Sequence, residues 1–382
     1  MEPFSVAPFT IGIDDDVLDD LRRRIEHRRL PRPTPGAPWS AGTDPAELER
    51  LLAYWGGAFD WRAIERRLNS VPQFTADVGG RVHFAWIRAE RRDPAPMPII
   101  LSHGWPYTFA EMLPIAAHLA DPANHGGGPG DAFDVVIPSL PGFGFSEAPG
   151  EGRFIASEIA ERWHVLMHDV LGYERYATYG EDVGTWISDW TAALHPESVL
   201  GLFATHAAFP SAERRGDLTE EEIGFRAGLD AKWQGESAYS ELQSTKPDTL
   251  AAALNDSPAG LAAWLVEKFR TWSGSDAAYR AAWSDDDVLT TVTLYWVTQS
   301  IGTSFRAYFD DRFDTAPMPL VEVPVGVAVQ YREHGFPRSY AARTYRDIRA
   351  WQQLPSGGHF TAKQSPGLVA AAMREFFRPL RG

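Results

Sequence analysis

Residues 175–184, RYATYGEDVG, decide the fold of this chain. The run RYATYG is typical of a short buried strand, and the apolar spacing of residues 185–194 is typical of a helix. Between them, Gly180 and Gly184 stand two positions before and after Asp182. Small residues at these places allow a sharp turn that lifts the central side chain above the end of a sheet. The pattern predicts a nucleophile at Asp182, although an ordinary strand, turn and helix would also fit it.

An aspartate at such a turn carries different chemistry from a serine. Its reference pKa of about 3.9 leaves the carboxylate ionised at neutral pH, so it needs no base to become a nucleophile. A carboxylate suits attack on saturated carbon, which produces an alkyl ester that water then cleaves. The turn therefore favours a covalent ester mechanism over direct attack by water.

Further strand candidates lie on both sides of this turn. Short apolar runs at residues 97–104, 133–139, 201–206, 323–329 and 347–355 alternate with helix-length stretches such as residues 157–171. Strands that alternate with helices predict a mostly parallel sheet covered on both faces. We therefore expect an α/β core formed by residues 93–209 and 318–382.

Two regions depart from this alternation. Residues 1–92 are expected to form a lead-in of helices and loops, with helices near residues 14–30, 45–56 and 61–68. Residues 210–317 contain no strand candidate and show helical patterns, as at residues 258–272 and 288–309. A helical insertion between two core strands predicts a cap over the sheet.

Composition excludes several kinds of partner and chemistry. The chain has 382 residues, a formal net charge of −15 and no cysteine. That charge opposes binding to nucleic acid and to anionic membranes, and the missing thiols remove disulfides and cysteine-ligated zinc. No stretch is long and apolar enough for a membrane span. We expect a soluble, cytoplasmic protein.

Neither a phosphate loop nor a metal site is predicted. The GGGPG run at residues 126–130 lacks the lysine and hydroxyl residue of a phosphate loop. His164 and His168 have the i, i+4 spacing of metal ligands but no third ligand accompanies them, so we expect a half-buried helix face. We predict no cofactor and no metal.

Two further motifs suit the chemistry of Asp182. The sequence HGWP, residues 103–106, follows a strand and can aim the backbone N–H of Trp105 at the turn. Together with the N–H of Val183 it would form an oxyanion hole. The sequence GGHF, residues 357–360, places His359 in a loop near the end of the chain, which fits the order nucleophile, acid, histidine.

These motifs, in this order and with a helical insertion, resemble the α/β-hydrolase superfamily and, more narrowly, the epoxide hydrolases of the microsomal type. The resemblance covers nearly the whole chain. It includes PFTIGIDDDVLDDLRRRI at residues 8–25, PSLPGFGFSE at residues 138–147 and the cap segment at residues 239–272. It implies an α/β-hydrolase fold with a mostly parallel sheet, a helical cap and an N-terminal helical meander.

The resemblance also implies roles for single residues. Asp182 matches the family's nucleophile and His359 its general base. The usual glycine and tryptophan beside the nucleophile are here Glu181 and Val183, although Val183 still supplies a backbone N–H. Whether Glu181 points away from the site cannot be read from the sequence.

The acid that orients the histidine is less clearly marked. The family places it after a short strand, where this chain has QYRE at residues 330–333. We therefore predict Glu333 as the acid, with Asp347 and Asp310 as competitors. A loop glutamate paired with a neighbouring arginine would explain Glu333 equally simply.

Opening an epoxide requires an acid because the departing alkoxide is strongly basic. Tyrosine, with a pKa near 10, can hydrogen-bond the ring oxygen and protonate it. The resemblance places the family's two tyrosines at Tyr239 and Tyr308, both in the cap. Two tyrosines that simply pack a helical cap are the alternative.

The resemblance implies an epoxide hydrolase that converts an apolar aryl or alkyl epoxide to a vicinal diol through an Asp182 ester. The expected partners are the epoxide and water, without nucleic acid or membrane, and a homodimer is possible. Detoxification and the tailoring of a secondary metabolite both fit. The alternatives are a haloalkane dehalogenase, which would not need two phenols, and a non-catalytic ligand-binding relative.

Overall fold

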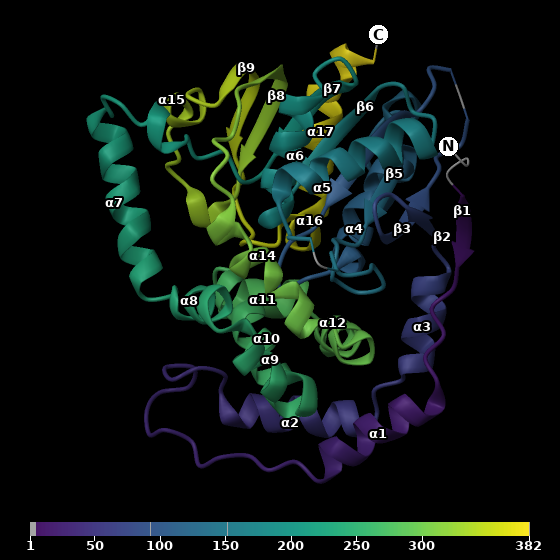
Figure 1. Ribbon diagram of the computed structural model, residues 1–382, viewed down its shortest axis with the longest axis vertical. Coiled ribbons are helices and arrows are strands. Elements are labelled where there is room, and N and C mark those ends of the chain that lie inside the picture. The colour runs from purple at the N-terminus through teal and green to yellow at the C-terminus, as the bar shows by residue number, and fades with distance from the viewer. Residues whose placement is uncertain (1–4, 92, 151, 382) are drawn as a thin grey trace.

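The computed structural model describes residues 5–91, 93–150 and 152–381 and is built around one sheet (Figure 1). The described residues form nine strands in the order β1-β2-β3-β5-β4-β6-β7-β8-β9. Their bounds are Val6–Phe9, Gln73–Asp77 and Arg81–Ile87 for β1 to β3, Met97–Ser102, Phe133–Pro138 and Tyr176–Gly180 for β4 to β6, and Val199–Ala204, Val321–Val329 and Tyr345–Gln353 for β7 to β9.

The strands from β5 through β9 pair in parallel, whereas β1, β2 and β3 join the other edge antiparallel. Helices cover both faces: α5 (Ala156–His164) packs with α6 (Val183–Leu194), and α4 (Phe109–Ala120) packs with α17 (Pro366–Phe377). Every residue of β5 is buried, as expected of a strand covered on both sides. The predicted α/β class and mostly parallel sheet are confirmed.

The N-terminal region differs from the prediction, because it contributes three strands to the sheet. A lead-in of helices and loops was expected, and α1 (Asp15–Glu26), α2 (Pro45–Gly56) and α3 (Trp61–Asn69) are indeed helices. However, β2 and β3 form a hairpin that turns at Gly79 and Gly80, with φ angles of 82° and 124°. Short strands that are only partly buried carry a weak pattern, so they were missed.

Between β7 and β8 every regular element in the described chain is helical. The α-helices are α7 (Glu220–Gln234), α8 (Ala238–Thr245), α9 (Pro247–Asp256), α10 (Pro258–Trp272), α11 (Asp276–Ala282), α12 (Asp285–Thr298), α13 (Ile301–Ser304) and α14 (Arg306–Phe309). The helical pattern expected over residues 288–309 is interrupted at Gln299, which has a left-handed φ of 53°. We refer to α7–α14 as the cap.

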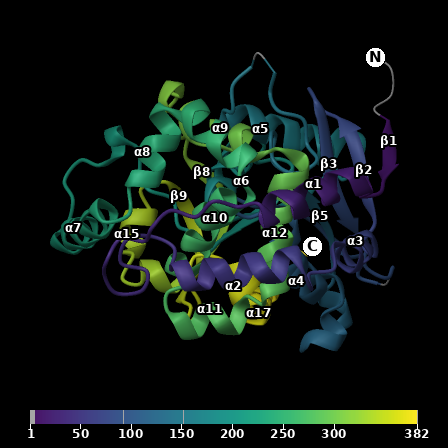
Figure 2. The ribbon, with the colours of Figure 1, turned by 90° about the horizontal axis from the view of Figure 1, so that it is seen from below.

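The N-terminal helices pack against the cap as well as against one another. Figure 2 shows α1 and α2 running beside α10 and α12, on the side of the cap away from the sheet in Figure 1. Trp55 on α2 donates its indole N–H to the hydroxyl of Thr293 on α12 at 2.9 Å, and both side chains are buried. Arg50 pairs with Asp285 at 2.6 Å nearer the surface. The segment therefore holds one side of the cap in place.

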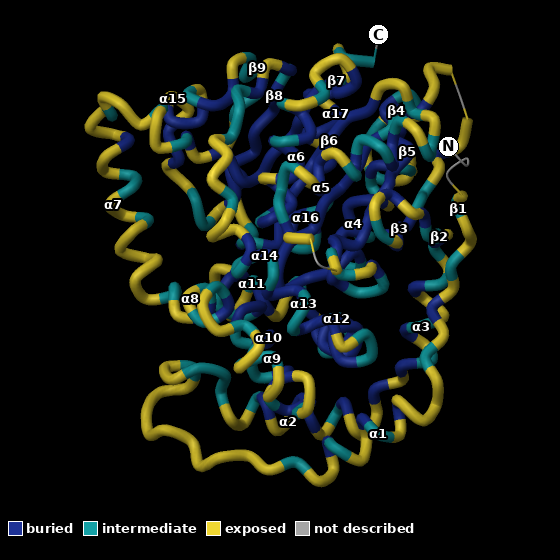
Figure 3. The backbone as a smooth tube through the Cα atoms, in the orientation of Figure 1, coloured by how far each residue is buried: buried dark blue, intermediate teal, exposed yellow. Residues whose placement is uncertain are grey.

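Burial follows the layers of the fold. Figure 3 shows the strands largely buried and α7 exposed along most of its length. On α1, Leu18, Leu21 and Ile25 face the interior, whereas Val17 is 37% exposed. No helix within the described ranges is both long and apolar enough to cross a lipid bilayer.

Candidate functional site

The turn between β6 and α6 holds Asp182 in a backbone conformation that few side chains adopt. Its φ and ψ are 54° and −126°, outside the regions favoured by residues other than glycine. A Cβ at Gly180 would lie 1.9 Å from the carbonyl oxygen of Gly184, and one at Gly184 would lie 2.2 Å from that of Ser102. The two glycines are therefore required for the turn to close beneath Asp182.

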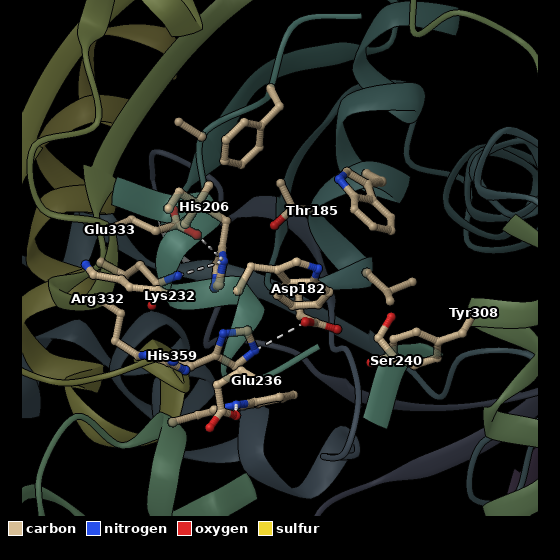
Figure 4. A pocket seen from close by; sticks show the side chains of 18 of the residues that line it. Asp182, Thr185, His206, Lys232, Glu236, Ser240, Tyr308, Arg332, Glu333 and His359 are labelled. Carbon is tan, nitrogen blue, oxygen red and sulfur yellow. Dashed lines mark hydrogen bonds and ion pairs between the residues drawn. The ribbon is translucent and has the colours of Figure 1, made fainter. Parts of the chain in front are cut away.

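The Asp182 carboxylate lies between backbone donors and a histidine (Figure 4). Its Oδ1 accepts the N–H of Trp105 at 3.0 Å, and Oδ2 lies 3.2 Å from Nε2 of His359. Burial opposes ionisation, but His359 and the backbone N–H groups of Trp105 and Val183 together lower the pKa of Asp182. The carboxylate is thus an anion at neutral pH, as a nucleophile must be.

His359 reaches the site from the loop after β9. Its backbone N–H bonds the carbonyl of Trp272 at 2.8 Å, and a Cβ at Gly358 would come within 2.4 Å of that same oxygen. Burial lowers the pKa of His359 below its ordinary value, although the hydrogen bond to Asp182 opposes this effect. The imidazole is therefore mostly neutral at pH 7 and able to accept a proton.

Tyr239 on α8 and Tyr308 on α14 lie together in the cap. Their ring centroids are 5.8 Å apart at 81°, and the Trp105 indole stacks on Tyr239 at 5.4 Å. Burial and the charge of Asp182 raise the pKa of Tyr239, and burial together with Tyr239 and Asp182 raises the pKa of Tyr308. Both phenols stay protonated at neutral pH and can donate hydrogen bonds.

Glu333 lies in the site but does not meet His359 as predicted. It ends the short turn Tyr331–Glu333 after β8, and its Oε1 lies 3.6 Å from Nδ1 of His206. Within the described ranges, neither a hydrogen bond nor an ion pair joins Glu333 to His359. The expected direct contact is therefore replaced by a contact with a second histidine.

The two competing acids lie elsewhere. Asp310 accepts the backbone N–H of Phe154 at 2.8 Å and pairs with Arg306 at 2.9 Å. Asp347 lies on β9 and pairs with Arg349 at 2.7 Å. Both carboxylates have structural partners, so Glu333 remains the predicted acid.

His206 and Glu181 are the residues that sequence reasoning did not place. His206 follows β7 directly, just as Asp182 follows β6, so its position at a strand end was a readable signal. The Glu181 carboxylate turns into the core, where Tyr179, Thr361 and the N–H of Ala362 donate to its Oε1. Burial raises the pKa of Glu181, although the hydrogen bonds from Thr361 and Tyr179 oppose this effect.

These residues line a cavity of about 470 Å³ between the strand ends and the cap. Both aromatic and charged side chains line it. The aromatic members are Trp186, Phe209, Trp233, Tyr239, Trp272 and Tyr308, and the charged members include Asp230, Lys232, Glu236, Asp311 and Arg332. Across the residues that the structure describes, no group of three or more His, Asp and Glu side chains could hold a metal ion.

Comparison with known proteins agrees with this geometry. Residues 6–112 match the family model described as epoxide hydrolase N terminus, and residues 97–361 match the alpha/beta hydrolase fold. A putative epoxide hydrolase of Stigmatella aurantiaca is 36% identical over 98% of this chain and 86% of its own length. The chain belongs to the epoxide hydrolase family.

More distant members of the family share both sequence and fold. Epoxide hydrolase 1 of Oryctolagus cuniculus is 32% identical over 98% of this chain and 89% of its own length. The crystal structure of juvenile hormone epoxide hydrolase from Bombyx mori superposes with a TM-score of 0.89 at 28% identity, covering 99% of this chain and 95% of that one. The Aspergillus niger epoxide hydrolase gives 0.84 at 29% identity, covering 98% and 97%. The resemblance found in the sequence is therefore confirmed at the level of family and fold.

Proposed function

We propose that this protein opens an apolar aryl or alkyl epoxide to a vicinal diol through a covalent ester on Asp182. The observation that carries the proposal is the position of Asp182. Its anionic carboxylate lies between the N–H of Trp105 and the imidazole of His359, in a cavity that also contains Tyr239 and Tyr308.

The two carboxylate oxygens of Asp182 have different surroundings. Oδ1 is held by the N–H of Trp105 at 3.0 Å, whereas Oδ2 lies 3.2 Å from His359. The oxygen that faces the backbone N–H groups of the oxyanion hole is the one on which negative charge develops during ester hydrolysis, so it becomes the carbonyl oxygen of the ester. We therefore assign Oδ2 as the attacking atom and Oδ1 as the future carbonyl oxygen of the ester.

In the first step Oδ2 forms a bond to an epoxide carbon while the carbon–oxygen bond of the ring breaks. The departing alkoxide takes a proton from one of the two tyrosines, Tyr239 or Tyr308. The other tyrosine donates a hydrogen bond to the same oxygen. The products are a hydroxyalkyl ester of Asp182 and one tyrosinate. Positioned acids of this kind contribute about 10²–10⁴-fold to rate.

In the second step His359 takes a proton from water, and the resulting hydroxide attacks the ester carbonyl. Negative charge develops on Oδ1, where the N–H groups of Trp105 and Val183 stabilise it. Collapse expels the diol alkoxide, which takes the proton from His359. The proton of the regenerated Asp182 carboxyl passes to the tyrosinate, which becomes a neutral phenol again, so the balance is one epoxide and one water to one diol.

The test is to trap the ester with racemic styrene oxide and detect it by intact-protein mass spectrometry. The His359→Gln variant should gain the mass of one styrene oxide and retain it, because alkylation remains possible when the base is absent. Asp182→Asn should show no added mass and no turnover. The matched control His195→Gln lies outside the cavity and should behave as the unmodified protein does.

Two results would overturn the proposal. One is diol formation by Asp182→Asn at the rate of the unmodified protein. The other is release of halide from a chloroalkane without turnover of any epoxide, which would favour a dehalogenase.

A further inference from the structure

His206 and Glu333 form a buried pair beside the general base. The His206 residue is only 9% exposed, and its Nδ1 lies 3.6 Å from Oε1 of Glu333 and 3.0 Å from Nε2 of Gln330. These partners come from the loop after β8, whereas His206 comes from the end of β7. The loop after β8 therefore supplies the partners of the His206 imidazole, which itself comes from the end of β7.

The other side of His206 meets His359. The two ring centroids are 4.8 Å apart with an interplanar angle of 80°, an edge-to-face arrangement that defines the plane of each ring. Trp272 contacts His359 from another direction at 4.9 Å. The His359 imidazole is thus held by ring contacts, in place of the carboxylate expected from the sequence.

We propose that His206 is a positioning residue for the reaction proposed above: Glu333 pairs with its Nδ1 at 3.6 Å, and its ring fixes the plane of the His359 imidazole. Glu333 then acts on the general base through His206. The arrangement is an acid, a histidine and a second histidine in sequence, ending at Oδ2 of Asp182. The inference rests on the proposed function, because His359 must be the base of ester hydrolysis.

Several buried polar atoms of His206, Glu333 and Gln330 lack a hydrogen-bond partner in the described chain, and this agrees with a positioning role. Among the residues that the structure describes, Nε2 of His206, Oε2 of Glu333 and Oε1 of Gln330 are buried without a hydrogen-bond partner. Unpaired buried polar atoms cost stability, so their retention together in a catalytic cavity points to function.

Charged groups surround His206 on several sides. Burial opposes its protonation, but Glu333 more than offsets this and raises the pKa of His206. The charge of a protonated His206 in turn lowers the pKa of His359. The groups that face the pair are Glu181 and Asp182 from the β6 turn, Glu333 and Arg332 from the β8 loop, and His359 itself.

The test separates the two chemical steps by single-turnover kinetics with styrene oxide. His206→Phe keeps a ring beside His359 but cannot bond Glu333, so ester formation should stay within threefold and ester hydrolysis should slow at least tenfold. The fall of the hydrolysis rate at acidic pH should begin at a higher pH. The reason is that removing the positive charge of His206 raises the pKa of the neighbouring His359. His206→Asn keeps a donor for Glu333 but no ring, and it should slow hydrolysis as well.

The matched control is His195→Phe, which removes another histidine paired with a carboxylate, Glu161 at 3.2 Å, but outside the cavity. It should change neither step. Unchanged hydrolysis, with its fall at acidic pH also unchanged, in both His206 variants would overturn the inference while leaving the proposed function intact. If the unmodified protein forms no ester at all, the proposed function itself fails. His206→Asn decides the matter should His206→Phe not fold.

Discussion

At the scale of single residues, the proposed chemistry depends on two phenols and one carboxylate. Burial and the charge of Asp182 keep Tyr239 protonated, and burial keeps the neighbouring Tyr308 protonated as well. A neutral phenol can both bind the epoxide oxygen and give it a proton, so each tyrosine can partly replace the other.

Replacing both tyrosines should therefore be much worse than replacing one. We expect the Tyr239→Phe, Tyr308→Phe double variant to lose about 10²–10⁴-fold in ester formation, and each single variant to lose less. Stopped-flow measurement of ester formation checks this. The control is Tyr279→Phe, a buried cap tyrosine outside the cavity, and equal rates for the double variant and this control would contradict the expectation.

The pH dependence of the two steps should also differ. Hydrolysis needs neutral His359, whose pKa lies below its ordinary value, so hydrolysis should fall only as the pH drops below about 6.5. Ester formation needs ionised Asp182, whose pKa is also lowered from a far smaller starting value, and it should persist to lower pH. Single-turnover rates between pH 4 and 9 measure how each step falls off in acid. If ester formation and ester hydrolysis fell off at the same pH, these assignments would be contradicted.

The positions of the candidate site residues were predictable only where the chain carries a local motif. Asp182, Trp105 and His359 stand in short turns between regular elements, and the structure places all three together. The partner of Glu333 could not be predicted, because it depends on how the ends of β7 and β8 face one another across the sheet. Single sequences contain no direct information on such a contact.

At the scale of elements, the β6–α6 turn is the most constrained part of the fold. Adding a methyl group at Gly184 would place it 2.2 Å from the carbonyl of Ser102, which belongs to β4. Backbone atoms of a central strand cannot move aside without disturbing the sheet.

Gly184→Ala should consequently destabilise the protein by about 1–3 kcal/mol or more and abolish ester formation. Gly224→Ala on α7 is the matched control, because a Cβ there meets nothing within 4 Å. It should add up to about 1 kcal/mol of stability, since alanine favours helix more than glycine does. Thermal unfolding of both variants checks the comparison, and similar midpoints would show that the turn is looser than described.

Helices whose apolar residues recur with a strong periodicity were predicted well, and strands with a weak hydrophobic pattern were not. The helices at Pro45–Gly56 and Pro258–Trp272 end where their Pro, Gly and apolar spacing indicate. The strands β1, β2 and β3 were missed: β1 and β2 are short and only partly buried, and the apolar residues of β3, RVHFAWI, were not recognised as a strand. They add an antiparallel edge to the sheet, far from the catalytic residues.

At the scale of the whole molecule, the N-terminal helices hold the cap. The buried hydrogen bond from Trp55 to Thr293 joins α2 to α12 at 2.9 Å, and the surface pair Arg50 and Asp285 lies close by. A buried hydrogen bond contributes about 0.5–1.5 kcal/mol, whereas an exposed ion pair contributes about 0–1 kcal/mol and weakens with salt.

A double-mutant cycle on Trp55→Phe and Thr293→Val should therefore show a coupling of about 1 kcal/mol that does not depend on salt. The parallel cycle on Arg50→Met and Asp285→Asn should give less, and its coupling should fall at high ionic strength. Urea unfolding at two salt concentrations measures both. Zero coupling between Trp55 and Thr293 would mean that α2 does not hold the cap.

The exposed helix α7 lies at the opposite side of the cap from this attachment, and four of its residues reach the cavity: Leu229, Asp230, Lys232 and Trp233. Substitutions at these four residues change the wall of the cavity, whereas Glu222 of the same helix is buried, pairs with Arg343 at 2.9 Å and should be kept. A laboratory seeking to change which enantiomer is consumed should randomise these four positions first and leave the strand ends as they are.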